Sequence, residues 1–129
     1  MSKQKHITGY DIREPDSATI TVGSATDTVD IAIQLLDYAG NALKTKAAIR
    51  CYYTTDADGD TVEAVGAASV VATDGIVIED LTTFTATLIS EDDGTVGITI
   101  DGDGTATDYL CLIFPDGHVQ ISDAFTFTS

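Results

Sequence analysis

The chain of 129 residues carries 21 Asp and Glu side chains against six Lys and Arg side chains, so its formal net charge is -15. All six basic side chains lie within residues 1–50, where an equal number of acidic ones cancels them, and residues 51–129 therefore carry the entire net charge. Such a surface repels phosphate backbones and anionic membranes, which argues against both as partners. The hydrophobic content of 43% predicts one folded domain rather than a disordered chain.

The beginning of the chain differs from the remainder. Residues 1–17 are polar, comparatively basic and weakly patterned, which predicts an N-terminal arm ahead of a domain over residues 18–129. Met1–Gln4 leads into no apolar signal-peptide segment, and no apolar run approaches the roughly 20 residues of a membrane span. We therefore expect a protein that is made and kept in the cytosol and has no membrane partner.

The domain after the arm is predicted to consist of strands throughout. Thr, Val and Ile are abundant, and their branched side chains suit a pleated strand better than a helix. Val29, Ile31 and Ile33 alternate with polar or small residues, which is the period-two pattern of a half-buried strand. We expect strands near residues 18–23, 28–37, 47–54, 61–65, 68–72, 75–79, 84–90, 95–100, 106–114 and 118–127.

Turn sequences separate these runs at regular intervals, among them Asp58-Gly59 and Asp93-Gly94. Each supplies a glycine able to take a positive φ beside an Asp that can bond its own backbone. The run over 106–114 is apolar on both faces, which predicts a central strand. Short, evenly spaced strands of this kind predict an all-β fold, an antiparallel β-sandwich.

Two cysteines, Cys51 and Cys111, permit one disulfide without requiring it. In a chain without an export signal, free buried thiols are favoured over a disulfide bond. Only two histidines accompany these cysteines, which makes a poor ligand set for a structural zinc ion with its four close ligands.

Asp56, Asp58 and Asp60 place three carboxylates at alternate positions, as the first three ligands of a calcium loop do. An EF-hand loop also requires glycine at its sixth position and glutamate at its twelfth, where this chain has Thr61 and Ala67. The EF-hand match therefore fails. Solvated hairpin turns are favoured for the Asp-Gly sequences, and a divalent-cation site stays open as the alternative.

No catalytic motif accompanies the acidic side chains. His6 and His118 have no flanking catalytic pattern, no Gly-x-Ser-x-Gly turn is present, and a small sandwich seldom has the cleft of a glycosidase. The absence of Trp weakens a sugar-binding interpretation, and the tyrosines lack the basic groove that nucleic-acid stacking platforms need. We expect neither enzymatic activity nor a cofactor, and no nucleic-acid partner.

The segment over residues 108–117 carries a resemblance to known proteins. Tyr109 stands two residues before Cys111 on a late strand, which resembles the tyrosine corner of immunoglobulin folds. Thr105 replaces the usual acidic residue of that corner and the core Trp is missing, so the domain is not of the antibody type. The expected fold is therefore an immunoglobulin-like sandwich in the wider sense.

Two further segments add to this resemblance: the turn Asp37–Asn41 after an early strand, and the sequence Ala72–Gly75. Over roughly residues 18–128 the chain resembles the small immunoglobulin-like proteins on the virions of tailed bacteriophages. The resemblance implies a head decoration or cement protein on the outside of the capsid, assembled in the host cytoplasm. It also implies the major capsid protein as partner and a homo-oligomer, with a trimer favoured.

An acidic body facing outward suits such a role, and a less acidic side would then face the capsid. An arm that orders on contact can wrap much capsid surface. We expect the partner-binding residues to be the basic ones, Lys3, Lys5, Arg13, Lys44, Lys46 and Arg50. Two alternatives stay open: a head-fibre or tail domain of a virion, and a cation-dependent adhesion or carbohydrate-binding module.

Overall fold

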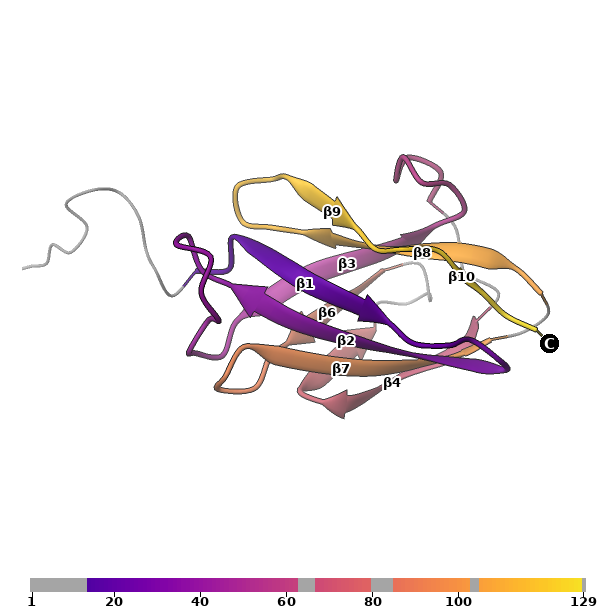
Figure 1. Cartoon of the computed structure of the whole chain (residues 1–129), viewed down its shortest axis with the longest axis horizontal. Helices are drawn as coiled ribbons and strands as arrows, with labels where there is room; N and C mark the ends of the chain where they lie inside the picture. Colours follow the sequence, from indigo (N-terminus) through magenta and orange to yellow (C-terminus); the bar gives the residue numbers. More distant parts are fainter. Residues whose placement is uncertain (1–13, 63–66, 80–84, 103–104, 129) are drawn as a thin grey trace, which may run out of the picture.

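The computed structural model describes residues 14–62, 67–79, 85–102 and 105–128, and every regular element in them is a strand (Figure 1). These residues include no helix that could span a membrane. The strands are β1 (Ser17–Val22), β2 (Thr28–Leu36), β3 (Ala48–Thr54), β4 (Ala67–Asp74), β5 (Ile76–Glu79), β6 (Thr85–Ile89), β7 (Thr95–Gly102), β8 (Thr107–Ile113), β9 (Val119–Ile121) and β10 (Phe125–Thr126).

The strands form two antiparallel sheets that enclose one core (Figure 1). The smaller sheet has the order β1-β2-β7-β4, and the larger sheet has the order β10-β8-β3-β6-β5, with β9 also paired to β8. In the smaller sheet the buried Ile31 lies opposite Ile98, so inward-facing side chains match across β2 and β7. The predicted all-β antiparallel sandwich is confirmed, as is the central position of the strand near residues 106–114.

The core takes its side chains from alternate positions of the strands in both sheets. Leu88 of β6 and Ile98 of β7 are fully buried, and burial of each such side chain stabilises the fold by roughly 1.5–3 kcal/mol. The largest buried side chains include Tyr53 of β3, with Phe114 and Phe127, which directly follow β8 and β10. These bulky groups fill the interior from the side of the larger sheet.

The expected strand over 118–127 is wrong in one respect, because two short strands occupy that range. Both β9 and β10 pair with β8, but the register slips by one residue between them. At the slip, the Ser122 hydroxyl accepts a hydrogen bond from the Leu110 amide and donates one to the Asp123 carbonyl. A side chain that replaces a ladder bond interrupts the pairing there.

The remaining expected strands differ little from the observed ones. The expected strand at 61–65 reduces to a bridge between Thr54 and Val62, since residues 63–66 lie outside the described part of the chain. The others begin and end within two residues of their predicted bounds. β1 begins at Ser17, the last residue of the predicted arm, and most of that arm lies outside the described residues.

Two connections join the sheets at opposite edges of the sandwich. At one edge, the Gln120 side chain on β9 accepts a hydrogen bond from the Ala18 amide at 3.0 Å and donates one to the Ala18 carbonyl at 2.6 Å. At the other edge, β4 passes into β5 through Gly75, whose φ is +82°. A Cβ atom at this position would collide with the Ile89 carbonyl oxygen, so only glycine fits.

Candidate functional site

The loop after β3 holds the three Asp residues that the sequence suggests as cation ligands. The Asp56 carboxylate accepts a hydrogen bond from the Thr61 hydroxyl at 2.7 Å. It also accepts bonds from the amides of Gly59 and Asp60, at 3.0 and 3.3 Å. These bonds, with the Thr61 hydroxyl foremost, lower the pKa of Asp56 to about 2. The carboxylate therefore shapes the turn by binding the loop's own donors.

The other two carboxylates of the loop, Asp58 and Asp60, are exposed to solvent. In the described part of the chain, no group of three or more His, Cys, Asp or Glu side chains is arranged to hold a metal ion. The hydrogen bonds within the loop are those of a turn rather than of a coordination shell. The described geometry thus gives the cation alternative no support at this loop.

The same loop folds back over the larger sheet and covers Cys111. The Tyr52 hydroxyl donates a hydrogen bond to the Gly59 carbonyl at 2.9 Å, and the Thr54 hydroxyl lies 3.7 Å from the Cys111 sulfur. Cys111 is fully buried, and this burial raises the pKa of its thiol. A thiol that is both covered and held protonated is a poor nucleophile, so it offers no surface reactivity.

The two cysteines lie on paired strands but on opposite faces of the larger sheet. Cys51 lies opposite Leu112, and Cys111 lies opposite Tyr52. The pairing of the two cysteines is therefore offset by one residue, and their side chains point to opposite faces of the sheet. Cys51 belongs to the core between the sheets, whereas Cys111 lies beneath the loop. Both thiols are free and buried, which confirms the prediction from the sequence.

The basic residues that we predicted to bind a partner are divided among three places. Three of them lie outside the described residues: Lys3, Lys5 and Arg13. Lys44 and Lys46 lie between β2 and β3, and the Lys46 amine is 3.8 Å from a carboxylate oxygen of Asp92. Arg50 projects from β3 on the outer face of the larger sheet. The described members therefore do not form one basic cluster.

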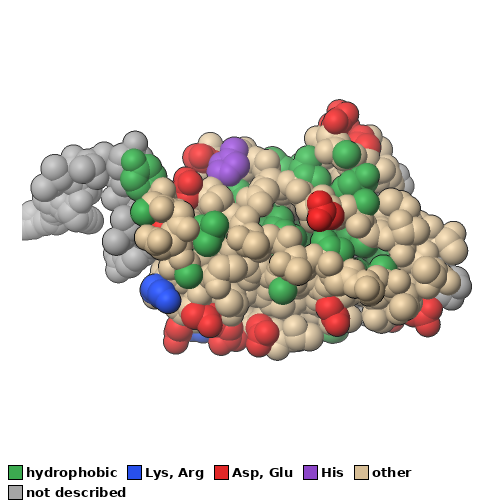
Figure 2. Space-filling view, viewed as in Figure 1, with side chains coloured by type: hydrophobic (Ala, Val, Ile, Leu, Met, Phe, Trp, Pro, Cys, Tyr) green, Lys and Arg blue, Asp and Glu red, His purple; other side chains and the backbone are tan. Residues whose placement is uncertain are grey.

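A polar groove runs along the outer face of the smaller sheet and encloses about 660 Å³. Its floor is low because Ala32 of β2 lies opposite Gly97 of β7, and neither residue has a long side chain. Thr21 of β1 pairs with Ala32, and Asp74 of β4 pairs with Gly97. Both side chains line the groove, one on each side of this low floor. Figure 2 shows this side of the molecule, where the acidic side chains lie mainly along the border.

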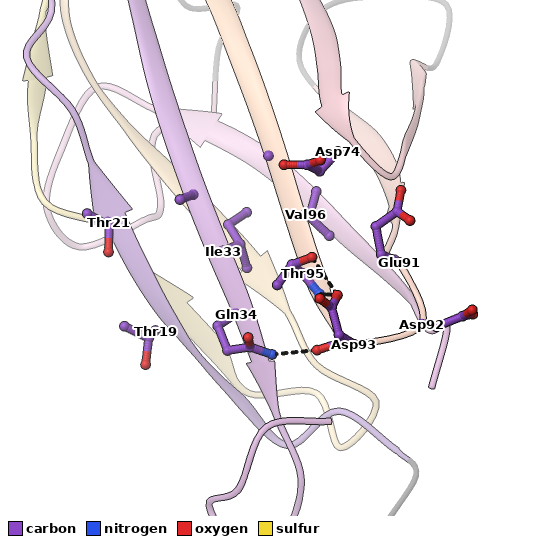
Figure 3. Close-up of a pocket in the computed structure, with 12 residues that line it drawn as sticks. Thr19, Thr21, Ile33, Gln34, Asp74, Glu91, Asp92, Asp93, Thr95 and Val96 are labelled. Carbon is purple, nitrogen blue, oxygen red and sulfur yellow. Dashed lines mark hydrogen bonds between the residues drawn. The ribbon is translucent and has the colours of Figure 1, made fainter. Parts of the chain in front are cut away.

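Carboxylates gather at one end of this groove, and two of them are engaged in local hydrogen bonds (Figure 3). Glu91 accepts a bond from the Gly75 amide at 2.8 Å. Asp93 accepts bonds from the Thr95 hydroxyl and amide, which lower the pKa of Asp93, and its carbonyl accepts a bond from Gln34. The described lining holds no His, Cys or Ser, and its hydroxyl groups all belong to threonine residues.

The outer face of the larger sheet has a different character, because large aliphatic side chains are exposed on it. The exposed fractions are 51% for Ile76, 51% for Ile78, 36% for Ile113 and 41% for Val119. The strand registers place one row of side chains across β5, β6, β3, β8 and β9. We define the outer apolar face as this row and its neighbours, namely Ile78, Thr87, Arg50, Ile113, Val119, Ile76, Ile89 and Ala48.

The outer apolar face contains no acidic residue, and Arg50 is its only charged member. Glu79, at the end of β5, faces the other side of the sheet, where its charge adds to burial in raising the pKa of the core residue Tyr53. In a chain with a net charge of -15, a set of outward-facing residues that spans five strands and holds no acidic side chain is a marked asymmetry, and the acidic loop of residues 56–60 lies beside this set, over Cys111. This face is the strongest candidate for a binding surface in the described residues.

This face was not predicted from the sequence, although the sequence contains part of the pattern that forms it. Ile76 and Ile78 lie on either side of Val77, and the run 109–113 is apolar on both of its faces. Such patterns are also typical of strands that are buried on both faces. Only the order of the strands shows that these outer positions lie side by side and are uncovered.

The fold belongs to the class of immunoglobulin-like β-sandwiches, as predicted. A solved structure, the cohesin module from the family 33 glycoside hydrolase of Clostridium perfringens ATCC13124, is similar with a TM-score of 0.52 and 13% sequence identity. The similarity covers 88% of this chain and 97% of that module, and it shows the fold alone. No protein-family model matches the chain, and no curated protein matches it.

Proposed function

We propose that the chain is a non-enzymatic structural protein that decorates or cements the outer surface of a tailed-bacteriophage head. The observation that carries the proposal is the outer apolar face, which is free of acidic residues in a chain with a net charge of -15. Contiguous exposed apolar patches on soluble proteins mark interaction surfaces, because leaving them in water is unfavourable. This feature supports a function in binding another protein.

The rest of the charge distribution supports a position outside a protein shell. Residues 51–129 supply the entire net negative charge, and exposed acidic turns such as residues 91–93 surround the sandwich. A surface of this kind repels nucleic acid and keeps neighbouring particles apart. The proposed partner is the major capsid protein, with a homo-oligomer, favoured as a trimer, on the exterior of the virion.

The N-terminal arm forms the second part of the proposed contact. Lys3, Lys5 and Arg13 lie within residues 1–17, a segment less acidic than the body of the protein. A segment that becomes ordered on binding can cover a large area of the partner. We therefore propose that the arm and the less acidic side of the sandwich bind the capsid together.

Co-sedimentation with empty heads of the phage that encodes the protein tests this proposal. The wild-type protein should sediment with the heads and reach a saturating, reproducible occupancy. A variant that lacks residues 2–14 should bind with lower occupancy, because it has lost the arm. Heads that leave the wild-type protein in the supernatant at micromolar concentration contradict the proposed function, whereas unchanged occupancy of the truncated variant contradicts the role of the arm.

The polar groove favours a second candidate, a cation-dependent adhesion or carbohydrate-binding module. Threonine hydroxyls and the Asp74 carboxylate in its lining are groups that bind cations or sugar hydroxyls. A ligand at about 100 times its Kd stabilises a protein by about 2.7 kcal/mol, which is a shift of several degrees for a chain of this size. Millimolar calcium should therefore raise the melting temperature of an adhesion module, and it should leave that of a decoration protein unchanged relative to EGTA.

A further inference from the structure

The edge strands of the two sheets differ in how well they are protected. An edge strand presents unpaired backbone N–H and C=O groups, which can pair with another chain unless the edge is covered or interrupted. β1 is covered by the Gln120 side chain, which bonds both backbone groups of Ala18. The pairing of β4 with β7 shifts register twice, which disrupts β4 as a template for a further strand. β9 and β10 are only three and two residues long.

β5 has none of these protective features. Its four residues, Ile76 to Glu79, pair with β6 in continuous register and include neither Pro nor Lys. Two aliphatic side chains on its outer side, Ile76 and Ile78, are each 51% exposed. Among the strands that the structure describes, only β6 pairs with β5, so the other side of β5 is open.

The hydrogen-bond pattern shows which backbone groups of β5 point to the open side. Directly after β6, the Ser90 amide donates a hydrogen bond to the Ala47 carbonyl beside β3. Successive residues of a strand direct their backbone groups to opposite neighbours, so Ile89 bonds to β5 rather than to β3. Ile76 lies opposite Ile89 and therefore bonds to β6. By the same alternation, the N–H and C=O groups of Val77 point to the open side.

We propose that β5 is a strand-addition site, at which an extended segment of the capsid subunit pairs with the outward backbone groups of Val77 and Glu79. The added strand would continue the larger sheet, so its side chains would alternate between the same two sides as those of β5. On the outer side they would lie beside Ile76 and Ile78, which favours aliphatic residues. On the inner side they would lie beside Glu79, the only charged residue of β5, which favours a basic residue.

This inference rests on the proposed function for the identity of the partner, and it adds the mode of contact and the chemistry of the segment. The charge of the chain favours a different protein over a second copy. Pairing of two β5 strands would bring together two bodies that each carry a net charge of -15. β5 itself has no basic residue to offset the charge of Glu79 in such a pair.

A matched pair of proline substitutions tests the site. Val77 on β5 and Val22 on β1 are both half-buried valines that pack against the core from an edge strand. The Gly23 amide bonds to the Asp30 carbonyl, so the neighbouring Val22 N–H points away from β2. Each proline therefore removes an outward N–H group without breaking a bond between described strands, and its ring obstructs further pairing. Circular dichroism and the urea midpoint establish that each variant is folded.

The affinity of each variant for empty heads is measured by co-sedimentation over a range of protein concentrations. We expect Val77→Pro to raise the Kd at least about tenfold, because main-chain bonds supply much of the affinity of an added strand. Val22→Pro should leave the Kd within about twofold. Glu79→Lys should raise the Kd at least about fivefold, because it opposes a cation to the basic residue of the segment, and Glu79→Gln should lie between this variant and the wild type.

Hydrogen exchange of the wild-type protein tests the backbone pairing itself and requires no variant. In the free protein the Val77 and Glu79 amides should exchange faster than the Ile78 amide, which bonds to β6. On heads, the exchange of the Val77 and Glu79 amides should slow at least about tenfold, while that of the Val22 amide should not change. Mass spectrometry with fragmentation to single residues resolves these sites.

The outcomes separate the inference from the proposed function. If the wild-type protein binds heads but the Val77 and Glu79 amides exchange at the same rate free and bound, strand addition is overturned while the proposed function stands. Equal binding by folded Val77→Pro and Val22→Pro variants leads to the same conclusion. If the wild-type protein does not bind heads, both are overturned. Slower exchange of the Val77 amide at high protein concentration without heads would identify a second copy as the occupant and would also overturn the inference.

Discussion

The two outer faces of the sandwich differ strongly, although the strands beneath them have similar inner sides. The smaller sheet directs small and polar residues outward around a groove, of which Ala32 and Gly97 form the floor. The larger sheet directs Ile and Val side chains outward around Arg50. The difference shows that the period-two pattern determines the core, while the outer positions of each sheet can differ in chemical character without changing the fold.

The two faces also differ in their energetic relation to water. The groove side presents hydroxyl and carboxylate groups that water solvates well. The exposed aliphatic groups of the larger sheet gain about 25 cal/mol for each Å² that a partner covers. The aliphatic side therefore gains more from docking, and substitutions at the two edges that join the sheets test how independent the two sides are.

The largest effect is expected where the chain crosses from one sheet to the other. Gly75→Ala should lower the free energy of unfolding by about 2–4 kcal/mol, because it combines a left-handed φ with a collision against the Ile89 carbonyl. Gly40→Ala is the matched control, since its φ is +85° but no atom lies within 4 Å of the added Cβ. Urea unfolding should show a loss of about 1–2 kcal/mol for the control. Equal losses would contradict the account of this crossing.

The opposite edge should show the next largest effect. Gln120→Ala removes both hydrogen bonds to the buried Ala18, and the unpaired backbone groups should lower the free energy of unfolding by about 1–3 kcal/mol. Gln34→Ala, which removes bonds on the exposed groove side, should have a smaller effect. A larger loss for Gln34→Ala in the same urea measurement would mean that Gln120 does not join the sheets.

A smaller, pH-dependent effect is expected at the loop that covers Cys111. The pKa of Asp56 in the folded state is about 2 and the ordinary value is 3.8, so the ionised group stabilises the fold above about pH 3.8. This contribution is lost as the pH falls through about 2. The melting temperatures of the wild type and of Asp56→Asn should therefore converge between pH 5 and pH 2.

The cause of this shift can be tested by a second variant. Thr61→Val removes the strongest hydrogen bond to the carboxylate, so an NMR titration should show a higher pKa for Asp56. An unchanged value in Thr61→Val, or a constant difference in melting temperature for Asp56→Asn at every pH, would contradict the role of the loop's own hydrogen bonds.

The smallest effect is expected beside the groove. Lys46→Ala removes an ion pair with Asp92 at 3.8 Å whose side chains are 61% and 90% exposed. Such a pair is screened by water and salt, so the free energy of unfolding should change by less than about 0.5 kcal/mol. A loss above about 1 kcal/mol in low-salt urea unfolding would show that Lys46 has a structural role.

The sandwich could be predicted well from the sequence, because strands and turns are specified by residues that are close together in the chain. A strand is indicated by alternating side chains, as in Val29 to Ile33, and a turn is indicated by glycines such as Gly94. The predicted strand bounds followed from these local patterns. The interruption at Ser122 was not predicted, because it depends on a hydrogen bond to Leu110 on another strand. Patterns along one strand contain no information about such a contact.

The candidate site was predicted less well, for a related reason. Basic residues were selected by charge, and of the three that the structure describes only Arg50 lies on the outer apolar face. That face depends on the order of β5, β6, β3, β8 and β9, which brings Ile78 and Val119 into one row from distant parts of the sequence. The strand order requires the three-dimensional structure, so the surface could not be assembled from the sequence.

The most direct test of the central claim is a cryo-electron microscopy map of empty heads decorated with the wild-type protein. The proposed function predicts that the outer apolar face lies against the capsid. The groove over Ala32 and Gly97 should then face solvent. A map in which the groove side contacts the capsid and Ile78 faces solvent would contradict the account.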